Sequence, residues 1–159
     1  MVVKKFETVS SCRRSTTPNL ASKELIQDTA PLQDTALLKA VRVTPKYISN
    51  AAEQGLKLLR EGRGGDGLTE GTKDAARRMA RGQISDDKII LANAWGARHA
   101  VDLEAPKNSD PKDLEYPAAG AVAHFLWGID PLDPQPARDW FFRESEKIKK
   151  DRLEASSKG

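Results

Sequence analysis

Residues 85–103 read SDDKIILANAWGARHAVDL, and this stretch decides the fold class. Ser85 is a preferred N-cap residue, and the pair of aspartates after it suits the positive end of a helix dipole. A stripe of apolar and small residues then recurs at helical spacing, at Ile89, Ala92, Gly96, Ala100 and Leu103. Because small residues let another helix approach closely, we expect this stretch to form a central helix.

Helical signals also flank this stretch on both sides. Thr44 is a preferred N-cap, and Pro45 is a preferred first helical residue. The other predicted helices cover residues 45–61, 69 or 72 to 81, 118–127 and 137–154. No segment shows sustained β alternation. The sequence therefore predicts an all-α fold, a compact bundle of about five helices over residues 44–155, with a disordered tail at 156–159.

Residues 1–43 differ from this body in composition, being polar with scattered apolar residues and two prolines. Such a segment lacks a core of its own and is too long for an ordinary loop. We expect an extended, largely irregular N-terminal arm that is either disordered or lies on a partner. Its candidate partner-binding residues are the apolar ones: Phe6, Val9, Leu20, Leu25, Ile26, Leu32, Leu37 and Leu38.

Composition excludes several classes of protein. The chain has 159 residues, a net charge of +3 and 31% charged residues, and its longest uncharged runs fall short of the ~18 residues of a membrane span. No apolar stretch follows Lys4 and Lys5, so we expect neither a signal peptide nor a membrane partner. Cys12 is the lone cysteine, which excludes an internal disulfide, and with two histidines it gives too few ligands for structural zinc. We predict no metal and no cofactor.

The charges are distributed unevenly. Residues 1–43 carry seven bases and four acids, whereas residues 104–134 carry two bases and six acids. The second predicted helix has a basic face, formed by Lys73, Arg77, Arg78 and Arg81. This face is a candidate nucleic-acid contact, but a solvated surface that pairs with Asp74 is the favoured interpretation. A helix-turn-helix is disfavoured, because the next helix would present two aspartates to phosphates.

No residue set completes a catalytic site. His99 and Asp102 share a helical face and can form a pair, but no nucleophile with a supporting motif accompanies them. We interpret His99 and His124 as structural, and the chain as not an enzyme. The glycine run 62–67 lacks the spacing of a phosphate-binding loop and is interpreted as a turn between helices. The bulky aromatic residues are expected to form one core: Trp95, Trp127, Trp140, Phe125, Phe141 and Phe142.

A family resemblance adds a biological context. The blocks that carry it are GLKLLREGRGGDGLT (55–69), AARRMARGQISDDK (75–88), AWGARHAVDLEAPKN (94–108) and YPAAGAVAHFLWG (116–128). Together they resemble a small helical module encoded in the head-gene clusters of tailed bacteriophages, free-standing or fused to capsid maturation proteins. The resemblance spans about residues 44–143 and brings no catalytic residues with it.

The resemblance implies a virion structural protein, made in the host cytoplasm and located in the head. We expect a decoration or cement-type protein that contacts the major capsid protein or another head protein through its arm. Self-association is a further expectation, since Phe142, Ile148 and Leu153 can serve a symmetric interface. The alternatives are a small nucleic-acid-binding accessory protein and an inhibitor of a host protein.

Overall fold

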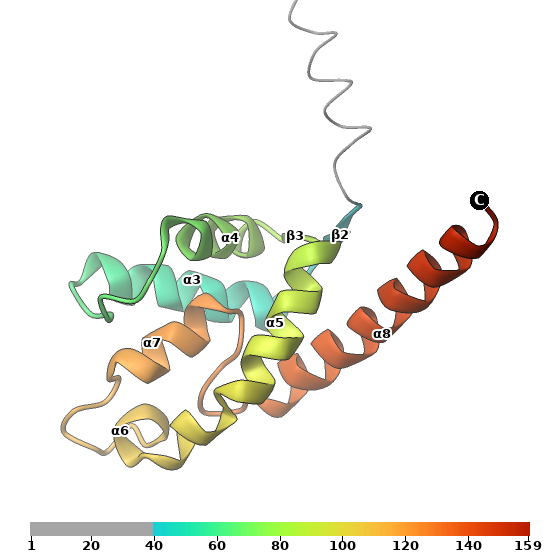
Figure 1. Ribbon diagram of the computed structural model, residues 1–159. Helices are drawn as coiled ribbons and strands as arrows, with labels where there is room; N and C mark the ends of the chain where they lie inside the picture. Colours follow the sequence, from blue (N-terminus) through green and yellow to red (C-terminus); the bar gives the residue numbers. More distant parts are fainter. Residues whose placement is uncertain (1–39) are drawn as a thin grey trace, which may run out of the picture. The chain divides into compact units, whose positions relative to one another are not determined.

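The computed structural model describes residues 40–159. Within them it contains six α-helices, one 3-10 helix and one two-stranded sheet (Figure 1). In chain order the elements are β2 (Val41–Val43), α3 (Lys46–Arg60), α4 (Glu70–Ala80), β3 (Gln83–Ser85), α5 (Asp86–Arg98), η2 (Ala100–Glu104), α6 (Pro106–Ser109), α7 (Ala119–Leu126) and α8 (Gln135–Ser157). The predicted helical bundle is confirmed.

Local capping signals set where the helices begin. Thr69 caps α4 by accepting a hydrogen bond from the backbone N–H of Thr72, which selects the first of the two predicted starts. Ser85 caps α5 in the same way, accepting from the N–H of Lys88 at 3.2 Å. The glycine run is the expected turn, in which Gly62 adopts a φ of 83° and donates to the carbonyl of Leu59.

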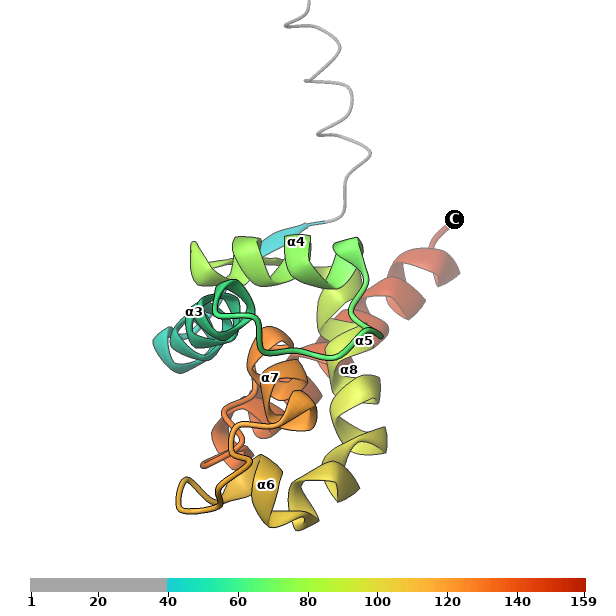
Figure 2. The same ribbon diagram turned by 90° about the vertical axis from the view of Figure 1, so that its left-hand side faces the viewer.

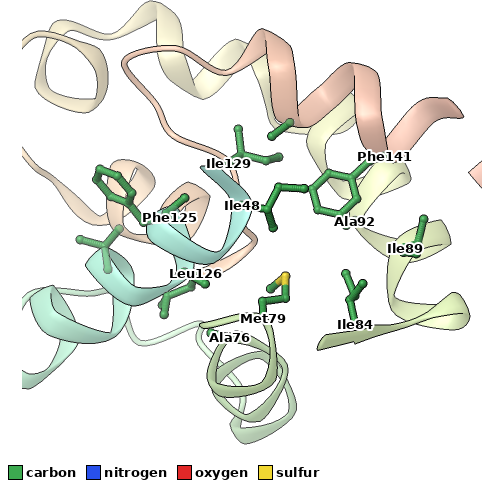
Figure 3. Packing of buried hydrophobic residues seen from close by; sticks show 14 of the residues in the cluster. Ile48, Ala76, Met79, Ile84, Ile89, Ala92, Phe125, Leu126, Ile129 and Phe141 are labelled. Carbon is green, nitrogen blue, oxygen red and sulfur yellow. The ribbon is translucent and has the colours of Figure 1, made fainter. Parts of the chain in front are cut away.

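The helices pack as two neighbouring sets. Helix α3 contacts α4 and α7, while α5 lies along α8 (Figures 1 and 2). Ile48 of α3, Met79 of α4 and Phe141 of α8 are fully buried and converge in the core (Figure 3). Helices α3 and α7 approach so closely that a Cβ at Gly55 would lie 2.7 Å from the backbone nitrogen of Leu126. Gly55 is therefore required by the packing of these two backbones.

The small sheet is an element that the sequence pattern does not predict. Strand β2 pairs with β3 in antiparallel register, with Arg42 opposite Ile84. Each strand has only three residues, too few for an alternation pattern to appear. Residues 41–43, the last of the predicted arm, are thereby attached to the helical body.

The central helix is shorter than predicted. Helix α5 ends at Arg98, and the chain continues as the 3-10 helix η2 and the short helix α6, which the sequence did not indicate. The side-chain amide of Asn108 donates a hydrogen bond of 2.8 Å to the carbonyl of Asp102, which lies in the 3-10 helix. At the C-terminus, α8 extends through Ser157, so two residues of the predicted disordered tail are helical.

The prediction of a single aromatic core is wrong. Phe141 and Phe125 are buried, but 57% of the adjacent Phe142 is exposed, because neighbours on a helix point about 100° apart. Trp95 and Trp127 are only partly buried and stack on each other outside the centre of the core. Within residues 40–159, no helix has the length and apolar character needed to cross a membrane.

Candidate functional site

The predicted site residues of the arm lie outside the described residues. These are Phe6, Val9, Leu20, Leu25, Ile26, Leu32, Leu37 and Leu38. What the structure does describe is the point at which residues 1–39 join the body. We call this point the arm root and define it as Ala40, β2 and Thr44.

The arm root is held by side-chain ion pairs in addition to the strand pairing. Arg42 donates from Nε to Oδ1 of Asp86 at 2.6 Å and from Nη1 to Oε2 of Glu144 at 3.1 Å. The hydrogen bond to the Asp86 carboxylate raises the pKa of Arg42. Asp86 is buried and Arg42 is partly exposed, and these contacts connect β2 to both α5 and α8.

Backbone and hydroxyl contacts complete the arm root. The carbonyl of Ala40 accepts from the N–H of Asp86 at 3.1 Å, and the N–H of Thr44 donates to Gly82 at 3.0 Å. The hydroxyls of Thr44 and Ser49 lie 2.7 Å apart, and both residues are buried. The arm root is therefore held to the body by backbone hydrogen bonds at Ala40 and Thr44 as well as by side-chain contacts.

The basic face of α4 is partly neutralised by its own helix. Lys73 pairs with Glu70 at 3.0 Å, and Arg77 pairs with Asp74, as expected of a solvated surface. Arg78 and Arg81 are exposed and form no ion pair with the residues that the structure describes. Of the four residues predicted as a nucleic-acid contact, these two arginines are the ones without such a pair.

The start of α5 is unavailable for insertion into a nucleic-acid groove. Asp86 is bound by Arg42 of β2, and Asp87 is bound by Arg152 of α8 at 2.7 Å. Both aspartates are therefore engaged from neighbouring elements. A recognition-helix role for α5 is excluded by this cover as well as by charge.

A continuous stack of side chains runs along one face of α5. Lys88 places its Nζ 3.2 Å from the ring centroid of Trp127, and Trp127 stacks on Trp95 with centroids 4.9 Å apart and planes 8° apart. Trp95 in turn stacks on His99 at 4.3 Å, and His99 Nδ1 lies 2.9 Å from Oδ2 of Asp102. We call these five residues the ladder.

Lys88 is an unusual member of the ladder. Its side chain is largely buried, and burial lowers the pKa of Lys88 to about 8. It forms no ion pair with a carboxylate of the described chain, since Asp86 and Asp87 beside it are taken by arginines. The face of Trp127 is what stabilises its ammonium group, through a cation–π contact.

His124 is a buried residue that packs against the ladder. The residue is buried, and its Nδ1 donates to the carbonyl of Gly120 at 2.9 Å. Burial lowers the pKa of His124, so the ring is neutral at pH 7, and its Nε2 has no partner in the described part of the chain. The ring packs edge-on against Trp95 at 4.9 Å. These contacts fit the predicted structural role of this histidine.

A groove of about 440 Å³ lies beside the ladder. Trp95, Trp127, His99 and Asp102 form one wall, with small residues of α7 and the loop before α4 forming the rest. Thr69 and Thr72 add two hydroxyls, 3.1 Å apart. Asp102 is the only acidic residue of the lining, which contains no lysine or arginine. The groove is therefore mostly apolar, with a carboxylate at one side.

Some of the residues at this groove could be predicted from the sequence. The pairing of His99 with Asp102 follows from their spacing, as predicted, but Trp95 was assigned to the core. Lys88, Trp95 and His99 recur at intervals of seven and four residues, which places them on one helical face next to the buried stripe. Trp127 comes from another helix end, and no local pattern indicates it. No group of three or more potential metal ligands is assembled within residues 40–159.

No family model, curated protein or solved structure matches this chain.

Proposed function

We propose that this chain is a non-enzymatic structural protein of a tailed-bacteriophage virion, associated with the head as a decoration or cement-type protein. It is made in the host cytoplasm, and residues 1–43 dock on the major capsid protein or on another head protein. The ordered blocks that resemble a phage head-gene module and the long polar segment support this proposal. The single structural observation that carries it is the arm root.

The arm root provides what a docking segment needs at its base. Arg42 ties β2 to Asp86 and Glu144, so a contact made by residues 1–39 would restrain α5 and α8 as well. Ordering a polar segment costs about 1–2 kcal/mol per residue. Repeated contacts with a large assembly would offset that cost, and a fixed base would make each contact restrain the whole body.

A truncation tests the proposal, and the structure decides where to cut. Removal of residues 1–43 would delete β2, and with it the pairing to β3 and both ion pairs of Arg42, so a loss of binding would not distinguish a lost docking segment from a destabilised body. The test variant therefore lacks residues 1–39 and keeps β2. We expect it to remain folded and to lose cosedimentation with purified capsids. Undiminished cosedimentation would contradict docking through this segment, and absence of the protein from purified virions by mass spectrometry would contradict a virion role.

A second candidate function is nucleic-acid binding, favoured by the exposure of Arg78 and Arg81. Double substitution of both arginines by glutamine should abolish a gel shift that weakens steeply as salt rises. Arg98→Gln, at an exposed position on α5, is the matched control. Without any shift at low salt, this second function is eliminated.

A further inference from the structure

The groove beside the ladder has the charge of a site for cations. Its lining includes the carboxylate of Asp102 and no lysine or arginine, so an anionic ligand would find no counter-charge there. A positively charged ligand is therefore favoured over a phosphate or a carboxylate.

The carboxylate is oriented and still open to a ligand. His99 contacts Oδ2 of Asp102, and among the described residues nothing bonds to Oδ1. The side chain of Asp102 is 39% exposed and belongs to the lining of the groove. Asn108 fixes the backbone of the same residue by donating to its carbonyl. A ligand would meet a positioned acceptor.

The aromatic wall is equally well positioned. Trp127 is held between Lys88 and Trp95, and Trp95 is held between Trp127 and His99, with His124 against its edge. Side chains fixed in this way lose little entropy when a ligand binds. Lys88, His99 and the two indoles themselves cover the ring faces, so the rings offer their edges to the groove. An apolar wall of this kind beside a carboxylate suits an arginine side chain, whose apolar stem lies along the wall while its guanidinium pairs with the carboxylate through two parallel hydrogen bonds.

We propose that this groove binds an arginine side chain presented by a partner protein. The guanidinium pairs with Asp102, its stem lies against Trp95 and Trp127, and Thr69 and Thr72 add two hydroxyls to the lining. The described lining comes from residues 65–127, so this proposal does not depend on docking through residues 1–43.

The test is a titration of the full-length, ¹⁵N-labelled protein with N-acetyl-arginine amide, followed through the indole N–H signals of Trp95 and Trp127. Both signals should shift saturably. N-acetyl-citrulline amide, which has nearly the same shape without the charge, should bind about fivefold more weakly. Absence of a saturable shift, or equal binding of the two probes, would overturn the proposal.

Two variants and one control locate the site. Asp102→Asn should weaken binding of the arginine probe about fivefold, and Glu104→Gln, at an exposed carboxylate two residues away, should leave it unchanged. Ala123→Leu fills the groove from α7 without touching the carboxylate and should abolish the shifts while the remaining amide spectrum is retained. Unweakened binding by either Asp102→Asn or Ala123→Leu would show that the probe binds elsewhere.

Discussion

Phe141 and Trp95 are large aromatic residues on packed helices, and they have different surroundings. Phe141, on α8, is fully buried where α3, α4 and α8 converge (Figure 3). Trp95, on α5, is half-buried in a stack that includes three charged or ionisable residues and borders a groove. The difference teaches that the position of an aromatic residue relative to the buried stripe, rather than its size, decides whether it stabilises the fold or forms a surface.

The largest expected effect lies on the core side of this comparison. Phe141→Ala should lower the free energy of unfolding by about 3–5 kcal/mol, because it removes a fully buried ring and leaves a cavity. Denaturant unfolding followed by circular dichroism measures the change. A loss below about 1 kcal/mol would show that Phe141 is no more important than a surface aromatic.

The close contact of α3 with α7 gives the next effect. Gly55→Ala places a Cβ 2.7 Å from the nitrogen of Leu126, so we expect a destabilisation of about 1–3 kcal/mol. Gly71→Ala is the matched control on α4, where the nearest atom is 3.7 Å away, and it should be neutral or slightly stabilising. Equal effects of the two substitutions would contradict the close approach.

On the ladder side, Lys88 should make stability depend on pH. Its pKa is about 8 in the folded chain against 10.5 for an ordinary lysine, so the unfolded chain holds more protons between these values. The contribution of Lys88 to stability therefore rises with pH from about 8 to 10.5. Lys88→Met removes this dependence. The stability of the variant relative to the parent should be greatest near pH 7 and should fall across that window, whereas a constant difference would show that Lys88 titrates normally.

The smallest effect is expected at Phe142. With 57% of its surface exposed, Phe142→Ala should cost less than about 1 kcal/mol, although it follows Phe141 directly. Compared with Phe141→Ala, this variant tests whether the burial of a phenylalanine, rather than its presence in the helix, determines its contribution to stability. A cost equal to that of Phe141→Ala would restore the single aromatic core that the structure does not show.

Local signals made much of the fold predictable. Thr69 and Ser85 cap their helices as their residue types indicate, and the stripe of Ile89, Ala92 and Gly96 is buried as its spacing predicts. These features depend on neighbours a few residues away. The pairing of β2 with β3 joins residues about forty positions apart, so no short-range pattern reports it.

The candidate groove was less predictable for the same reason. The contact of His99 with Asp102 lies within one turn and follows from spacing. The stacking of Trp127 on Trp95 depends on how α7 ends against α5, which is a result of tertiary packing. Lys88 gives no local sign of its environment, because its burial comes from the same contact.

The position of the arm root has a mechanical consequence. Tension applied at Ala40 would enter the strand pair and the Arg42 ion pairs, and would reach α5 at its first residue, Asp86. The groove lies toward the other end of that helix, where Trp95 and His99 line it, and its remaining walls come from α7 and the loop before α4. A load on the arm root and a ligand in the groove would therefore act on the same helix, and the contact of Lys88 with Trp127 is the side-chain link between the two places.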